Sequence, residues 1–223
     1  MYSEANRYFR YLDLVREDIR EELDLLGLHQ QRLKICDFGC GNGITTFGLA
    51  LEVSESICTG IDLFDSEPTP NTLAHYIEIL ENASHSTQPP KSSFPGGIYE
   101  LIKRKRLPQF IQGNVVSNQN LLHSIDLAYC KKLLTNLLGM NYEDAFSGEE
   151  RLLAGLRHIR QSIRSNGLAC VIEYDPKSKL GQYIELSGLH VLTQTQFKRS
   201  EIRSRGRTNV VSKFSIYLCR KTV

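Results

Sequence analysis

The sequence has no apolar run near 18 residues, so it predicts no membrane-spanning helix. Residues 1–7 lack the apolar core of a signal peptide. Charges are nearly balanced, and the net charge of +2 by itself requires neither a nucleic acid nor a membrane as partner. These absences favour a cytoplasmic protein with no membrane partner.

The cysteines do not include a C-x-x-C pair, the spacing of many metal and redox sites. Five of the six fall in predicted strands, namely Cys36, Cys58, Cys130, Cys170 and Cys219. We therefore expect small core residues with free thiols and no metal site. Cys40 differs because it lies in a glycine-rich turn.

With 223 residues and 41% hydrophobic content, the chain suits one α/β domain. Strands are predicted at 33–38, 57–62, 109–113, 125–130 and 168–174, and helices at 43–52, 70–82, 97–106, 148–164 and 177–187. Two long strands follow at 190–203 and 208–220, joined as a hairpin. This alternation predicts a mostly parallel sheet with helices on both faces and an antiparallel C-terminal hairpin.

An apolar stripe at helical spacing runs through residues 4–26, and Gly27 is placed to end that helix. We expect residues 1–30 to form an N-terminal helical extension of a domain covering 31–223. The helix packs on the domain, covers a ligand site with Tyr8 or Tyr11 near the reacting group, or does both. The turn-rich segment 83–97 is either a surface insertion or a wall of a substrate pocket.

The most informative segment is the strand that ends at Phe38 and enters a turn with Gly39, Gly41 and Gly43. The glycines remove side chains from the inner side of the turn, so a cofactor can lie against bare backbone. Asp62 ends the second predicted strand, where a carboxylate can accept hydrogen bonds from both hydroxyls of a ribose. These features predict a nucleoside-containing cofactor at the carboxyl edge of a parallel sheet.

Two common phosphate-binding motifs are absent from this turn. In the dinucleotide fingerprint the third glycine would occupy the position of Ile44, and no Gly-Lys-Ser/Thr follows as in a P-loop. Asp37 beside the turn would repel a pyrophosphate and suits a cationic amino group. The residues therefore favour an amino acid joined to a nucleoside.

The segment Asp37 to Gly43, with Asp62, resembles the cofactor motifs of class I S-adenosylmethionine-dependent methyltransferases. Residues 112–115 (Gln-Gly-Asn-Val) resemble that family's adenine-binding turn, with Asn114 in place of the usual Asp. Residues 165–173 resemble its turn and fifth strand. The resemblance implies a three-layer Rossmann-like fold with a seven-stranded sheet, and S-adenosylmethionine as cofactor.

The resemblance also implies the cofactor contacts. Asp37 would face the methionyl amino group, directly or through water, and the backbone of Gly39, Cys40 and Gly41 would line the methionyl part, with the Cys40 N–H pointing at the ligand. Asp62 would bind the ribose. The remaining expected contacts are Leu63, Asn114 and Val115 at the adenine, and Cys130 or the Lys131 stem at the sulfonium.

No catalytic triad is evident, which is consistent with methyl transfer because the cofactor carries the reactivity. Candidate catalytic residues are Tyr11, Lys131, Tyr174 and Asp175, and Tyr129 and Lys132 lie nearby in sequence. The segment after residue 128 has neither Asn/Asp-Pro-Pro-Tyr nor Pro-Cys, which argues against methylation of adenine, glutamine or cytosine C5.

A small-molecule acceptor is the leading prediction. The alternatives are an RNA or protein methyltransferase and a non-catalytic cofactor-binding module. Basic clusters at 103–106 and 198–207 would serve a nucleic-acid partner, but aromatic residues are not interleaved with them, so nucleic acid is not favoured.

Overall fold

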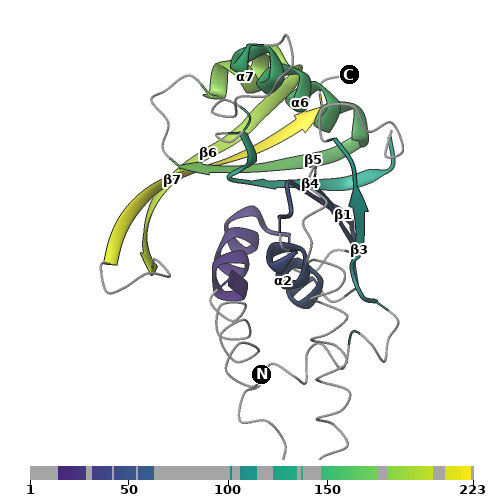
Figure 1. Ribbon diagram of the computed structural model, residues 1–223, viewed down its shortest axis with the longest axis vertical. Helices are drawn as coiled ribbons and strands as arrows, with labels where there is room; N and C mark the ends of the chain where they lie inside the picture. The colour runs from purple at the N-terminus through teal and green to yellow at the C-terminus, as the bar shows by residue number, and fades with distance from the viewer. Residues whose placement is uncertain are drawn as a thin grey trace, which may run out of the picture. The chain divides into compact units, whose positions relative to one another are not determined.

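The structure is a computed structural model (Figure 1) that describes residues 15–28, 32–41, 43–53, 55–62, 101, 106–114, 123–134, 137, 147–174, 180–202 and 209–221. Several predictions lie outside these residues: the helix at 70–82, most of the helix at 97–106, the segment 83–97, and Tyr8, Tyr11, Leu63, Val115 and Asp175. Among the described residues, no helix combines the length and apolar character needed to cross a membrane.

The strands form a seven-stranded sheet in the order β3-β2-β1-β4-β5-β7-β6. Among the described strands, only those at the C-terminal end pair in antiparallel fashion, so the predicted mostly parallel sheet with a C-terminal hairpin is confirmed. The chain divides into two compact units, residues 1–113 and 114–223, and each is described by itself. The predicted domain boundary near residue 30 stays a prediction.

The first unit contains β1 (Lys34–Phe38), α2 (Ile44–Glu52), β2 (Ile57–Asp62) and β3 (Gln109–Gln112). β1 and β3 flank β2, and both pairings are parallel. The last four residues of β1 are buried, as expected for a parallel strand covered on both faces. Because all strands run the same way, the end of β1 and the end of β2 meet at one edge of the sheet.

The N-terminal helix, seen over residues 15–26, packs against α2. It ends at Gly27, which has a φ of 64°, and Leu28 N–H donates to Leu23 O at 3.1 Å, so the predicted glycine cap is confirmed. Ile19 is fully buried, and a Cβ added to Gly48 of α2 would lie 2.5 Å from its Cδ1. The absence of a side chain at Gly48 therefore lets the two helices approach closely.

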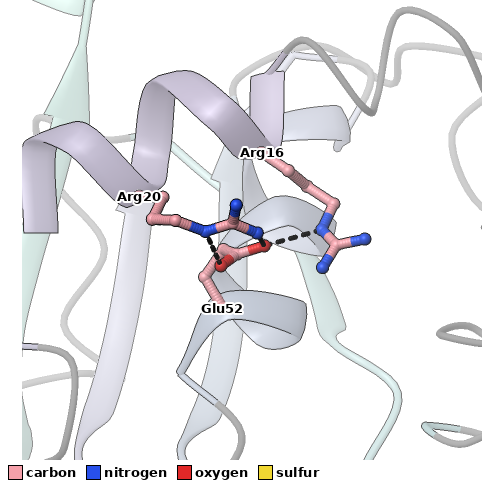
Figure 2. Close-up of polar contacts among 3 residues, drawn as sticks. All are labelled: Arg16, Arg20 and Glu52. Atoms are coloured by element: carbon pink, nitrogen blue, oxygen red, sulfur yellow. Dashed lines mark hydrogen bonds and ion pairs between the residues drawn. The ribbon is translucent and has the colours of Figure 1, made fainter.

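An ion-pair cluster joins the same two helices (Figure 2). Glu52, at the end of α2, accepts from Arg16 Nε at 2.7 Å and from Arg20 Nε at 3.0 Å. The Glu52 side chain is only 7% exposed, whereas the Arg20 side chain is 53% exposed. Water therefore screens the attraction between Arg20 and Glu52. The hydrogen bond to Glu52 is the main cause of a raised pKa at Arg20.

The second unit contains β4 (Ile125–Lys131), α6 (Gly148–Ser162), β5 (Ile163–Tyr174), α7 (Leu180–Leu186), β6 (Leu189–Ile202) and β7 (Asn209–Lys221). Figure 1 shows α6 and α7 on the same face of the β4–β7 strands. A capping box begins α6: Ser147 Oγ accepts from Glu150 N–H, and the Glu150 carboxylate accepts from Ser147 N–H at 2.7 Å.

The predicted start of the fifth strand is wrong. β5 begins at Ile163 and not at residue 168, and no separate turn precedes it at 165–167. The register instead shifts: Ile163 pairs with Ile125 and Leu168 pairs with Leu127 of β4, so the extra residues form an irregularity inside the strand. A Cβ at Gly167 would lie 2.8 Å from the Ile125 carbonyl, so this close approach requires glycine.

All six cysteines are buried free thiols, as predicted. Burial raises the pKa of Cys58 and of Cys219 to about 12 in each case. Burial is also the main cause of the raised pKa at Cys36. These thiols are therefore core residues that stay protonated at neutral pH.

Candidate functional site

The glycine turn folds back onto the end of β2. Gly39, Gly41 and Gly43 have φ values of 76°, 52° and 77°, a region that side chains disfavour. The Gly39 N–H donates to Ile61 O at 2.8 Å, and the Cys40 N–H donates to the same oxygen at 3.1 Å. The prediction that the Cys40 N–H points at a ligand is wrong for this structure, because Ile61 accepts it.

Asp62 lies directly beside this turn. Its carboxylate Oδ2 accepts from the Gly41 N–H at 2.7 Å, and its carbonyl accepts from the Gly113 N–H at 2.9 Å. Asp62 is half-buried, so part of the carboxylate stays accessible to a ligand. A Cβ added to Gly41 would meet nothing within 4 Å, so space is open on that side of the turn.

Asp37 lies beneath the same turn and is only 2% exposed. Its Oδ2 accepts from the Thr46 hydroxyl at 2.7 Å, which ties the end of β1 to the first turn of α2. An amino group outside the turn would reach this carboxylate through a water, or directly after Thr46 turns away. Of the two arrangements that the sequence left open, the contact through water fits the burial better.

The pKa of the Cys40 thiol reflects the negative charges around the turn. Burial raises the pKa of its thiol well above the ordinary value, and the charges of Asp37 and Asp62 raise it further. Both carboxylates therefore act at one point of the turn, and they favour a cationic ligand over an anionic one. The same shift keeps Cys40 protonated and removes it as a nucleophile.

Gly60 of β2 makes the packing of this turn possible. A Cβ at Gly60 would lie 2.8 Å from Cys40 Sγ and 2.8 Å from Thr46 Oγ1. Both distances are shorter than real Cβ contacts, so any side chain would displace the turn or the start of α2. No local pattern indicated this role, because the contacting side chains come from the turn after β1 and from α2.

The other predicted site residues that the structure describes belong to the second unit. Asn114 is exposed, Cys130 is 1% exposed near the end of β4, and Lys131 is half-buried at its last position. Tyr174 is the last residue of β5. Tyr129 of β4 is fully buried and is a core residue.

One residue that sequence reasoning missed holds the chain just after β4. Glu173 of β5 is fully buried, and its Oε1 accepts from the Leu134 N–H at 2.6 Å. The Lys132 N–H donates to Ile172 O at 2.8 Å, and Lys132 has a φ of 60°. In the sequence, the only signal for this role was a glutamate at the end of an apolar strand. The hydrogen-bond partner of Glu173 lies 39 residues away.

Comparisons with known proteins give a consistent fold. No protein-family model and no curated protein matches the sequence. Among solved structures, the chain is similar to a TehB-like S-adenosylmethionine-dependent methyltransferase from Corynebacterium glutamicum, with 18% identity, a TM-score of 0.54 and full coverage of both chains (100% and 100%).

Two further structures share the fold at lower coverage. A Burkholderia thailandensis 1,6-didemethyltoxoflavin-N1-methyltransferase, solved with bound 1,6-didemethyltoxoflavin and S-adenosylhomocysteine, is 11% identical at a TM-score of 0.55, over 95% of this chain and 78% of that one. The cyclase SpnF is 15% identical at a TM-score of 0.56, over 96% of this chain and 81% of that one. Together with the strand order, these similarities show that the chain has the Rossmann-like fold of class I S-adenosylmethionine-dependent methyltransferases.

Proposed function

We propose that this chain is a methyltransferase that uses S-adenosylmethionine and acts on a small molecule. The contact between the Gly41 N–H and the Asp62 carboxylate carries this proposal. It brings a glycine-rich turn and an acidic strand end together at one edge of a parallel sheet, with open space above Gly41. A ribose offers two hydroxyl donors, and a half-buried carboxylate is a suitable acceptor for both.

The proposed cofactor contacts divide by unit. In the first unit, Asp62 binds the ribose, Gly39 to Gly41 line the methionyl part, and Asp37 stabilises the amino group through water. In the second unit, Asn114 and Val115 contact the adenine, and Cys130 or the Lys131 stem contacts the sulfonium. Leu63 is a further proposed adenine contact. The negative charge acting at Cys40 supports a cationic ligand at the turn.

When bound, S-adenosylmethionine supplies a methyl group on a positively charged sulfur; its transfer leaves S-adenosylhomocysteine, and the acceptor's proton passes to a base or to solvent. The chain's own residues orient the reactants and exclude water. Cys40 takes no covalent part because its thiol stays protonated. The residues proposed to accept the proton or to bind the methyl acceptor are Tyr11, Lys131, Tyr174 and Asp175.

The proposal that the acceptor is a small molecule rests on analogy with two structurally similar proteins whose names state what they methylate. The Burkholderia protein methylates a small molecule by its name, and so does the magnesium protoporphyrin IX methyltransferase of Synechocystis. This chain is comparable in length to both proteins, since it covers 78% of the Burkholderia chain and 80% of the Synechocystis chain. The same proposal places the protein in the cytoplasm and has its N-terminal helix cover the ligand site.

A second candidate is a protein that binds the cofactor without transferring its methyl group. SpnF is named a cyclase, so a protein with this fold can carry another activity. The experiment that separates the two has two stages. Titration with S-adenosylhomocysteine tests the site, and incubation with methyl-labelled S-adenosylmethionine and a panel of small acceptors, RNA and protein tests transfer. Binding without labelled product from any acceptor would favour the second candidate.

A further inference from the structure

β6 forms one border of the sheet, since it is the last strand in the order and lies beside β7. In the part of the chain that the structure describes, no strand pairs with its outer edge. The strand runs from Leu189 to Ile202, and residues 192–196 within it are all exposed. An edge strand directs every second backbone N–H and C=O group away from its neighbour, so another strand can pair with these groups.

The middle of β6 has little protection against such pairing. Natural edge strands are protected by charged side chains, proline, bulges or short length. β6 has a register shift between Val191 and Thr193, and the next charged residue is Lys198. Between them lie residues 193–197 (Thr-Gln-Thr-Gln-Phe), which contain no charge, proline or glycine. This uncharged window is about as long as an average strand, so an extended chain can pair along its whole length.

The uncharged window is held in extended form before any partner binds. It pairs with β7 in an unbroken register from Thr193 to Phe197. Gln194 Nε2 also donates to the hydroxyl of Tyr217, a buried residue of β7, at 3.2 Å. The window therefore loses little further conformational freedom when it pairs with another strand, and this lowers the free-energy cost of association.

The two ends of the uncharged window carry opposite charges. Before its start, Glu185 of α7 accepts from the Val191 N–H at 3.0 Å and lies 3.5 Å from His190 Nδ1, and its side chain is 50% exposed. After its end, the strand continues with Lys198 and Arg199. When two copies of such a strand pair in antiparallel fashion, the start of each lies beside the end of the other. Glu185 of one copy then shares an end with the basic positions of the second copy, and the two-fold symmetry repeats this match.

The uncharged window is also complementary to itself. With the two-fold axis at Gln194, Thr193 of one copy lies opposite Thr195 of the other. With the axis at Thr195, this residue lies opposite its own copy, and Gln194 lies opposite Gln196. Both registers place uncharged polar residues opposite each other, and cross-strand threonine pairs stabilise antiparallel sheets. A parallel arrangement would instead place the basic ends side by side.

We propose that two copies of this chain associate through β6, in antiparallel fashion around a two-fold axis, so that their sheets join along residues 193–197. Leu192 lies next to this window, and Leu186 ends α7, which contacts β6. They are the large hydrophobic residues of the second unit that the structure shows as exposed, at 39% and 66%, and their burial would add to the interface. The proposal does not depend on the proposed function, because none of these residues is a proposed cofactor or acceptor contact.

The first test is the mass of the full chain in solution. One strand pair with two flanking leucines is a small interface, so we expect a reversible dimer with a dissociation constant of about 1–100 µM. Sedimentation velocity at protein concentrations up to about 300 µM, with and without S-adenosylhomocysteine, measures it. A wild-type chain that stays monomeric at the highest concentration would overturn the proposal and leave the edge of β6 to a strand of another protein. Assemblies that grow beyond a dimer would also overturn it, because a two-fold pairing uses up the edge.

Charge variants then locate the interface. The double variant with Thr193→Lys and Thr195→Lys, and the double variant with glutamate at both positions, should each be monomeric, because either register places like charges opposite each other. An equal mixture of the two should dimerise again, since lysine then faces glutamate. The matched control combines Gln161→Lys with Asn166→Lys, which adds the same charge at exposed positions of α6 and β5 and should dimerise as the wild type does.

Glu185→Gln tests the charged ends of the window. Glutamine can still accept from the Val191 N–H, but it loses the charge, so the dissociation constant of the dimer should rise several-fold. Circular dichroism shows that each variant folds before the masses are compared. Dimers of unchanged strength in both double variants, or a mixture of two folded variants that stays monomeric, would contradict pairing through β6.

Discussion

Gly41 donates its backbone N–H to the carboxylate of Asp62 at 2.7 Å, across 21 residues of sequence. This bond joins the turn after β1 to the end of β2. One carboxylate oxygen is thereby oriented by the backbone, and the half-buried side chain stays accessible to a ligand. The proposed ribose contact would therefore require little rearrangement of Asp62.

Replacing Asp62 tests the ribose assignment. Asp62→Ala should weaken S-adenosylhomocysteine binding more than about tenfold, because two ribose hydroxyls and the Gly41 N–H lose their acceptor. Calorimetric titration measures the change. Glu55→Ala is the control, since Glu55 is an exposed carboxylate that pairs with Arg106. Unchanged affinity in Asp62→Ala would show that the ribose lies elsewhere.

Gly60→Ala tests how the turn is packed. The new methyl group would lie 2.8 Å from both Cys40 Sγ and Thr46 Oγ1, so the turn must shift. We expect a loss of about 1–3 kcal/mol in the free energy of unfolding, and weaker binding of S-adenosylhomocysteine. Gly181→Ala adds the same methyl group where the nearest atom is 3.7 Å away. Similar behaviour of both variants in urea unfolding would refute the packing argument.

The packing of the N-terminal helix on α2 has a double-mutant test. In Gly48→Ala the new Cβ would lie 2.5 Å from Ile19 Cδ1, the atom that Ile19→Val deletes. Gly48→Ala should therefore destabilise the wild type, and in the Ile19→Val background it should be less harmful or even stabilising, because alanine favours helix by about 1 kcal/mol over glycine. Thermal unfolding of the four proteins gives the coupling energy, and additive effects would contradict the close approach.

The buried thiols predict how stability depends on pH. Burial raises the pKa of Cys58 from the ordinary value of 9.0 to about 12, and that of Cys219 likewise. A raised folded-state pKa stabilises the fold below the unfolded value, and this contribution is lost as pH rises through the folded value. The free energy of unfolding should therefore decrease between about pH 9 and about pH 12. A smaller decrease in Cys58→Ala than in the wild type, measured by urea unfolding, would identify the thiol; an identical slope would rule it out.

The sequence predicted those parts of the fold that local patterns encode. The glycine-rich turn between two apolar strands was enough to predict the bounds of β1, α2 and β2 closely. The carboxylate that ends β2 is also at the predicted position. Gly27 ended the first helix as expected, because a left-handed C-terminal residue is a local requirement. Local backbone chemistry was sufficient in each case.

Features set by distant neighbours were not predictable. The early start of β5 depends on Gly167 lying against carbonyls of β4, and a local reading of Asn166-Gly167 gave a turn instead. Glu173 had no local partner, and only the fold brings the Leu134 N–H to it. Likewise, nothing in the sequence distinguished Tyr129, a core residue, from a residue near a substrate.

The most direct test of the central claim is calorimetric titration of the wild-type chain with S-adenosylhomocysteine and, separately, with a nicotinamide dinucleotide. The turn between β1 and α2 lacks the dinucleotide spacing and has negative charge acting on it, so we predict saturable one-to-one binding of S-adenosylhomocysteine and none of the dinucleotide. Absence of heat at high micromolar S-adenosylhomocysteine, or tighter binding of the dinucleotide, would contradict the account.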